Sequence, residues 1–450
     1  MKLEESTLAE NYQSLDECSN SAIEHGQVLG ADEIQVSTSY DHEVRLVIEN
    51  GAFSSANSLE TQGIYMGIHK NQKKGSTTTN STDEAIIKDS VRTAVDISKY
   101  TLPDENLNYV GLEQAPPCQS HDFLYDSRLC DSTLADLKGY MQEALKCLTA
   151  DKRLCLDRFE LSHNISRSSL ANSHGVKQTE KQTMVSWTFF ALAKDGEQVS
   201  GFDYDSGFTF SLQNLEQNLL ADAKNFSQRV LANLNPIKCP SYKGLVIISP
   251  RALEDLWLSL MMFHISGRQV MDGKSRWIDK VGKKVMDSNI TIIDDPNDPK
   301  IMGATSFDSD GVGTSKKEII KNGILSQHYH DTYSAKKTGS AINGVAGGPF
   351  GLKVAPGDIP FTQLTQQEKP ILLVDRFSGN TDPISGDFSG VAKNSTLFEN
   401  GQNLGPVKET MIAGNFFSLC NEIAAISQEQ ESIEGRFLSP YLMFDNINVS

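Results

Sequence analysis

A helix that is apolar on nearly all sides is the feature that most constrains the fold of this chain. Within residues 256–265 only Ser259 and His264 are polar, so the one-sided pattern of a surface helix is missing. Such a helix must be covered in almost every direction, which places it at the centre of a domain. Gly267 follows and is expected to end the helix, because glycine is common just beyond a helix C-terminus.

The residues before this helix predict a buried strand and a helix start. Residues 244–249 read Gly-Leu-Val-Ile-Ile-Ser, a short β-branched run without polar alternation, which is typical of a buried strand. Ser249 can cap the helix, and Pro250 suits its first position, where a missing N–H costs nothing. The first turn carries three charged side chains that we expect to face solvent: Arg251, Glu254 and Asp255.

The first half of the chain repeats one pattern, in which a helix is followed by antiparallel strands and a second helix. Asn50-Gly51 is a hairpin signal in the first unit, and the proline-containing segment 101–120 predicts a linker to the second. The expected helices are 6–29, 81–98, 132–149 and 214–234. The expected strands are 33–50, 53–58, 63–69, 158–166, 169–172, 177–193 and 199–210.

Strands dominate after the central helix, with one late helix expected over 411–426. Expected strands are 290–294, 314–321, 324–330, 370–375, 395–399, 405–408 and 441–446. The sequence therefore predicts an α+β fold: helix and antiparallel-sheet units, then a large, mostly antiparallel β domain wrapped around the buried helix. We expect three domains, at residues 1–110, 111–235 and 236–450.

Composition excludes several classes of function. The chain of 450 residues has a formal net charge of −17 and no large basic cluster, which disfavours direct binding to nucleic acid. No window approaches the roughly 18 apolar residues of a membrane span. The first residues lack the apolar core of a signal peptide, and the seven cysteines are scattered and odd in number. We therefore expect a cytoplasmic protein with reduced thiols.

The order and spacing of several motifs are similar to those of the PmbA/TldD family, whose members are often described as modulators of DNA gyrase. The resemblance covers roughly the whole chain, is most specific over 244–450 and is weaker before residue 150. Besides the central helix, the segments that carry it are 273–277, 281–282, 291–296, 307–312, 320–325, 331–337, 385–389 and 412–415.

One kind of family member, TldD, resembles a zinc peptidase with a His-Glu-x-x-x-His motif on this helix and a cysteine ligand near the C-terminus. Matching the chain to that motif replaces the two histidines by Leu258 and Phe263, and the glutamate by Ser259. Leucine and phenylalanine offer zinc no donor atom, and a serine is no base for a metal-bound water. Residues 431–442, where the cysteine is expected, contain no Cys or His. The chain therefore resembles the PmbA (TldE) kind, which lacks the metal.

For a chain of this kind, the resemblance implies a subunit without a cofactor that pairs with a zinc-bearing TldD-like paralogue, or with itself as a dimer. It implies an unfolded peptide as substrate and zinc only on the paralogue. It also places the glycine-rich segment 344–351 and the segment Ser378-Gly379-Asn380 near the peptide-handling cavity. The candidate cavity residues are His264, Gly347, Gly348, Ser378 and Asn380.

Two alternatives stay open at this stage. His328 and His330 lie on one face of an expected strand, so they could hold a metal together with His264 if the two elements touch. The chain would then be a metal-dependent peptidase in its own right. The second alternative is a non-enzymatic protein that interacts with DNA gyrase, as the family description suggests.

Overall fold

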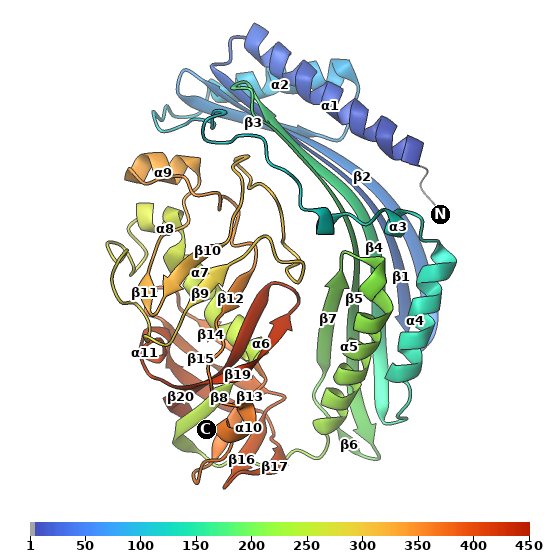
Figure 1. The fold of residues 1–450 in the computed structure, drawn as a ribbon, viewed down its shortest axis with the longest axis vertical. Coiled ribbons are helices and arrows are strands. Elements are labelled where there is room, and N and C mark those ends of the chain that lie inside the picture. Colours follow the sequence, from blue (N-terminus) through green and yellow to red (C-terminus); the bar gives the residue numbers. More distant parts are fainter. Residues whose placement is uncertain (1–4) are drawn as a thin grey trace.

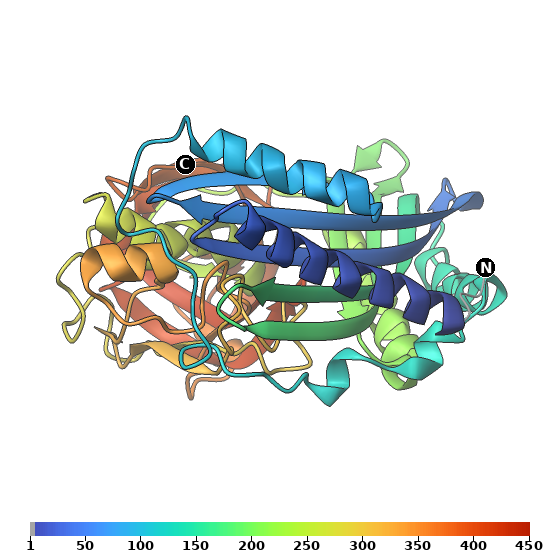
Figure 2. The same ribbon diagram turned by 90° about the horizontal axis from the view of Figure 1, so that it is seen from above.

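The computed structural model describes residues 5–450, which form a long curved sheet and a C-terminal body that the sheet partly encloses (Figure 1). Figure 2 shows α1 and α2 side by side on the outer surface of the sheet, with the C-terminal body on the other side. No helix among the described residues combines the length and the apolar character needed to cross a membrane.

The first sheet has seven strands in the order β3-β2-β1-β4-β5-β6, with β7 paired to β5. The two repeating units of the sequence are joined within it, because β1 pairs antiparallel with β4. Its strands are β1 (Glu33–Glu49), β2 (Ala52–Lys70), β3 (Lys73–Thr79), β4 (Leu154–Asn172), β5 (Lys177–Asp195), β6 (Gln198–Val199) and β7 (Asp203–Thr209). Its helices are α1 (Glu5–Val28), α2 (Glu84–Ser98), the 3-10 helix η1 (Asp122–Leu124), α3 (Ser127–Cys130), α4 (Leu134–Leu148) and α5 (Leu212–Ala232).

The strands of this sheet are longer than the sequence pattern suggests. The two short strands expected at 53–69 form one strand, β2, and those expected at 158–172 form one strand, β4. Side chains alternate between buried and part-exposed along most of β4 and β5, as a sheet with one covered face requires. The predicted hairpin turn is confirmed, since Asn50 and Gly51 both have positive φ, at 49° and 77°.

The second sheet has thirteen strands and is mostly antiparallel; only β8–β13 and β12–β20 pair in parallel among its named strands. The predicted α+β class is therefore confirmed. Its strands are β8 (Tyr242–Ile248), β9 (Ile292–Asp294), β10 (Lys317–Lys321), β11 (Ile324–Leu325), β12 (Leu352–Val354), β13 (Ile371–Val374), β14 (Arg376–Thr381), β15 (Asp387–Lys393), β16 (Thr396–Glu399), β17 (Gln402–Pro406), β18 (Thr410–Asn415), β19 (Ile423–Ile433) and β20 (Phe437–Val449). Short helices interrupt it: α8 (Gly267–Met271), α9 (Thr332–Thr338), α10 (Phe361–Leu364) and α11 (Phe416–Leu419).

The late helix expected over 411–426 is wrong. The segment forms β18, the single turn α11 and the start of β19. Ile412 and Ala413 pair with the last strand of the chain, at Val449 and Asn448. Pairing with a strand that is distant in sequence overrides the local helical pattern here, as tertiary contacts often do.

The central helix is confirmed at the core of the C-terminal body. It consists of α6 (Pro250–Leu253), a π-helical turn η2 (Glu254–Leu258) and α7 (Ser259–Ile265). Trp257 is 2% exposed and its ring packs on Phe416 and Phe444, with ring centroids 5.9 and 5.6 Å away. Gly267 does not end the helix: Ser266 does so by adopting extended backbone angles, and Gly267 opens the next helix, α8.

Candidate functional site

The start of the central helix confirms the predicted cap. The Ser249 side chain accepts a hydrogen bond from the backbone N–H of Ala252 at 3.2 Å, and Pro250 occupies the first helical turn. The hydroxyl of Ser249 also donates to the backbone carbonyl of Asp375 at 2.8 Å. The cap therefore fixes the helix against the strand that ends at Val374.

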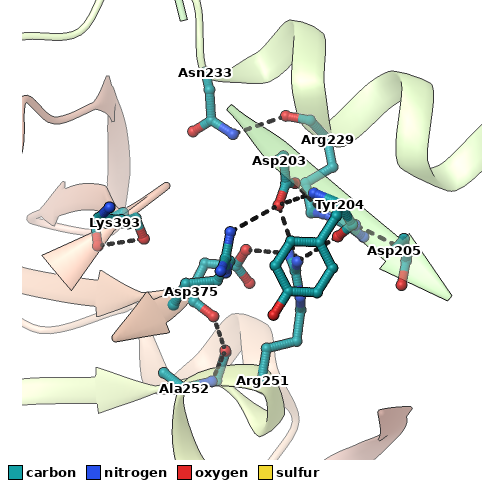
Figure 3. Close-up of polar contacts among 12 residues, drawn as sticks. Asp203, Tyr204, Asp205, Arg229, Asn233, Arg251, Ala252, Asp375 and Lys393 are labelled. Atoms are coloured by element: carbon teal, nitrogen blue, oxygen red, sulfur yellow. Dashed lines mark hydrogen bonds and ion pairs between the residues drawn. The ribbon is translucent and has the colours of Figure 1, made fainter. Parts of the chain in front are cut away.

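The expectation that Arg251 faces solvent is wrong. Arg251 is 8% exposed and its guanidinium donates to Asp375 at 2.8 Å, to Asp203 at 2.9 Å and to the backbone carbonyl of Tyr204 at 2.7 Å (Figure 3). Asp203 and Tyr204 belong to β7 of the first sheet. A charged side chain can be buried when it is paired in this way, and Arg251 thus joins the two halves of the molecule.

Further charges complete this cluster, which we call the junction cluster: Asp203, Asp205, Arg229, Arg251, Asp375 and Arg376. Arg229 donates to Asp203 and Asp205, each at 2.9 Å. Burial alone would raise the pKa of Asp203, but Arg251 and Arg229 hold it below the ordinary value. The cluster holds three cations and three anions, so each buried charge has an opposite charge nearby.

The residues of the junction cluster other than Arg251 gave no signal in the sequence. Asp203 precedes Arg251 by 48 positions and Asp375 follows it by 124. No local spacing connects such residues. The one indication of a buried ion pair was a charged residue, Arg251, in the first turn of an otherwise buried helix. Exposure of that residue to solvent was the simpler interpretation.

A small cavity of about 20 Å³, enough for about one water, lies beside the junction cluster. Glu254, Asp255, Arg376 and Glu434 are among the residues that line it. Burial raises the pKa of Glu254 to about 7, and Glu434 and Asp255 add to the effect by repulsion. A neutral Glu254 is therefore substantially populated near neutral pH.

Glu254→Gln is expected to remove a pH-dependent loss of stability. The folded-state pKa of about 7 lies above the ordinary value of 4.5, so the wild type loses stability as pH rises between these values. Because each unit is worth about 1.4 kcal/mol and this carboxyl is partly exposed, the loss should be about 1–2 kcal/mol. Urea titrations should show the variant more stable by that amount at about pH 8 and equal at about pH 4.5. The same difference at both pH values would contradict this assignment.

One side of the central helix is open, contrary to the expectation that nearly every side is covered. Ser259 is exposed, and Leu258, Met262 and Phe263 are only half-buried. These positions include those where the family resemblance implies zinc ligands and a catalytic glutamate. The side chains present are two hydrocarbons and a hydroxyl, so they do not fit zinc.

His264 points to the other side of the helix, into an aromatic cluster. It is fully buried, and its Nδ1 accepts a hydrogen bond from the backbone N–H of Arg276 at 3.2 Å. The ring centroids of Phe417 and Trp277 lie 5.0 and 5.6 Å from its own. Burial lowers the pKa of His264 to about 4, so the imidazole is neutral at physiological pH.

The two elements that carry His264 and the pair His328 and His330 do touch. Tyr329 forms a parallel bridge with Ser266, and its backbone N–H donates to the carbonyl of Ile265 at 2.8 Å. The rings of His328 and His330 are 6.2 Å apart. Within residues 5–450, however, no group of three or more His, Cys, Asp or Glu side chains is arranged to hold one metal ion.

Strand β14 carries two of the predicted cavity residues, Ser378 and Asn380, both exposed. Among the described residues, β14 pairs only with β15, so its second edge is free. That edge faces the central helix, because the N–H of Phe377 donates to Asp255 at 3.0 Å. Beyond the strand, the backbone of Pro383 lies beside His264. Strand β14 therefore starts beside the first half of the central helix, and the chain that follows it reaches the buried side of that helix at His264. We use the name helix–strand groove for the free edge of β14 together with the open helix face that Leu258, Ser259, Met262 and Phe263 form.

Gly347 and Gly348 lie in a different loop, which carboxylates hold in place. Asp308 accepts a hydrogen bond from the N–H of Ala346 at 3.0 Å, and Asp294 accepts one from Gly351 at 2.8 Å. Gly347 has a positive φ of 82° that favours glycine. Among the described residues, hydrogen bonds connect this loop to Asp294, Asp308 and Ser309, and its place in a peptide cavity stays a prediction.

Comparison with known families gives two matches. The family described as PmbA/TldA metallopeptidase central domain matches residues 128–234, and its C-terminal domain matches residues 241–450. Metalloprotease PmbA from Escherichia coli O157:H7 is 29% identical over 403 residues, which cover 89% of this chain and 86% of that protein. A Metalloprotease PmbA homolog from Haemophilus influenzae is 27% identical and covers 85% and 84%.

Solved structures share the fold over almost the whole chain. TldE from Thermococcus kodakarensis superposes with a TM-score of 0.85 at 19% identity, covering 96% of this chain and 100% of that one. A protein described as a proposed modulator of a DNA gyrase, from Thermotoga maritima, has a TM-score of 0.85 at 21% identity and covers 97% and 100%.

Proposed function

Because the chain belongs to the PmbA/TldD metallopeptidase family, we propose that it is a member without its own zinc centre that holds unfolded peptides beside a zinc-bearing paralogue. The single observation that carries the proposal is the helix–strand groove. It combines a free strand edge with a helix face at which Leu258, Ser259 and Phe263 stand in place of metal donors.

The groove suits an extended peptide. Alternate residues of a strand turn their backbone groups to the same edge, so Gly379 and Thr381 share the edge to which the N–H of Phe377 points. A peptide added at this edge is bound through its backbone, which makes the recognition tolerant of sequence. Its side chains would meet Leu258, Met262 and Phe263, whose apolar surfaces favour the residues that only an unfolded protein exposes.

On this proposal the chain contributes binding and exclusion rather than bond cleavage. An extended peptide could pair with the free edge of β14, which a folded domain with its own strands already paired could not do. The paralogue would supply the zinc, the water that the zinc activates and the base. If this chain pairs instead with a second copy of itself, the assembly would bind peptides without hydrolysing them. Since the residues of the groove do not fit zinc, we derive no hydrolytic step from them.

Ser259→Trp is expected to weaken peptide binding at least about tenfold, or 1.4 kcal/mol, because an indole on the open face fills the groove. Ser259 is exposed and no interaction of its side chain would be lost. The measurement is the fluorescence anisotropy of a labelled, unfolded peptide of about six residues, which as an extended strand is about 20 Å long.

Lys274→Trp is the matched control, since Lys274 is also exposed but lies beyond the central helix. It should bind the peptide as the wild type does. Equal binding by Ser259→Trp and the wild type would contradict the groove. Cleavage of the peptide by the purified chain alone, abolished by EDTA, would contradict the proposal that it carries no metal of its own.

A further inference from the structure

We propose that this chain has a second polypeptide site, in a cleft of about 1310 Å³ between α5 and the tip of the β19–β20 hairpin. The inference deepens the proposed function and rests on it, since it assigns the longer part of the same unfolded substrate to a separate surface. Figure 1 shows the hairpin directed toward α5 and β7 across the space between the two halves of the molecule.

Helix α5 presents a row of uncharged amides to the cleft. Its opposite face packs on the first sheet through Leu215, Leu219 and Phe226, which are fully buried. Side-chain amides both donate and accept hydrogen bonds, so they match peptide groups of any sequence. The exposed residues of α5 that line the cleft are the four amides Asn214, Gln217, Asn218 and Asn225, together with Ala221.

An aromatic corner closes one end of the cleft. The ring centroid of Phe210 lies 5.9 Å from that of Phe123 and 5.2 Å from that of Phe208. Phe210 is buried, while Phe123 and Phe208 are only partly buried and line the cleft. Partly exposed aromatic rings favour apolar side chains, which unfolded chains offer and folded surfaces largely hide.

The charged side chains that line the cleft carry both signs, and several of them already have partners. Arg128 contacts Asp126 at 2.7 Å, and Arg229 contacts Asp205 at 2.9 Å. Asp222 accepts a hydrogen bond from the indole N–H of Trp187 at 3.0 Å. A strongly charged ligand of either sign would meet like charges in this mixed lining, whereas the uncharged backbone of a polypeptide would not.

The edge of β7 borders the cleft but is closed to an added strand over its first half. The side chains of Asp203 and Asp205 accept hydrogen bonds from the N–H groups of Tyr204 at 2.9 Å and Ser206 at 3.0 Å. The guanidinium of Arg251 donates a hydrogen bond to the backbone carbonyl of Tyr204. Because these side chains already bond the backbone N–H and carbonyl groups on this edge of β7, another strand cannot pair there. The side-chain amides of α5 are then the groups available to bind the backbone of the ligand.

The cleft and the helix–strand groove are neighbours. Asp205, Arg251 and Glu434 line both the cleft and the small cavity that also contacts Asp255 and Arg376. Asp255 binds the first N–H of the free edge of β14. A polypeptide that leaves the groove at this end therefore reaches the cleft next, and one chain can occupy both.

Ala221→Trp tests the cleft by filling it from a position where no side-chain contact is lost, since Ala221 is exposed. The probe is a labelled, unfolded peptide of about 25 residues, compared with the peptide of about six residues, which is too short to span both sites. We expect the variant to bind the long peptide at least about tenfold more weakly and the short one unchanged. Asn218→Trp, on the same face, should act in the same way.

Lys224→Trp is the control, because Lys224 is exposed on α5 but does not line the cleft. If Ala221→Trp and the wild type bind the long peptide equally, or if the wild type binds both peptides equally, the cleft proposal is overturned while the groove stands. If long peptides bind and depend on Ala221 while Ser259→Trp has no effect on the short one, the proposed function fails and the cleft stands. Loss of self-association instead of peptide binding would assign the cleft to a second copy and overturn the proposal.

Discussion

Arg251→Met is expected to destabilise the protein by about 3–5 kcal/mol, because it leaves Asp375 without its ion pair and removes one of the two arginines that donate hydrogen bonds to the buried Asp203. Asp375 forms an ion pair with Arg251 at 2.8 Å, and Asp203 is 0% exposed. Burial raises the pKa of Asp375, and Arg251 is the first cation that opposes this rise. Without Arg251, Asp375 must either remain charged at high cost or bind a proton.

The urea dependence of tryptophan fluorescence measures this loss, since Trp187 and Trp257 are buried on the two sides of the junction cluster. A double variant, Arg251→Met with Asp375→Asn, should recover at least about 1.5 kcal/mol, because it removes the unpaired acid together with the base. Arg251→Lys should be intermediate, since it keeps the charge but cannot reach all three acceptors at once. An Arg251→Met variant as stable as the wild type would show that the junction cluster does not join the two halves.

Gly267→Ala is expected to cost about 3 kcal/mol, a large effect for one added methyl group. A Cβ at this position would lie 2.3 Å from Nδ1 of His330 and 2.6 Å from the backbone carbonyl of Tyr329. The carbonyl cannot move away, because it accepts the N–H of Gly267 itself at 2.7 Å. The methyl group would therefore break the bridge that fixes the end of the central helix.

Gly139→Ala is the matched control. Gly139 lies within α4, and a Cβ there would meet no atom within 4 Å. Alanine stabilises a helix interior relative to glycine, so this variant should gain up to about 1 kcal/mol in the same urea titrations. If both alanine variants gain stability, the close packing of Gly267 against His330 and the carbonyl of Tyr329 does not require a glycine.

Local patterns predicted the parts of the fold that depend on neighbouring residues. The cap at Ser249, the turn at Asn50-Gly51 and helix α5 each follow from residues only a few positions apart. The helix predicted over residues 411–426 was wrong because its structure depends on a residue far away in the sequence. Its apolar residues are compatible with a helix, but the partner that makes Ile412 a strand residue is Val449, at the end of the chain.

The candidate site, too, could be predicted from the sequence only in part. The sequence predicted the central helix and the replacement of zinc donors by Leu258, Ser259 and Phe263, because both are properties of one segment. It could not show that one face of that helix is open. Whether Leu258, Ser259 and Phe263 are covered depends on which elements pack around the helix once the chain has folded, and that is not a property of the segment itself.

The sequence by itself determined the α+β class and the buried central helix, since periodicity and side-chain chemistry are local. Only the tertiary structure decided that Arg251 is buried, because its partners Asp203 and Asp375 come from strands far apart in the chain. A charged side chain can be buried only where counterions lie close to it in space. The counterions of Arg251 reach it only after the two sheets have packed together.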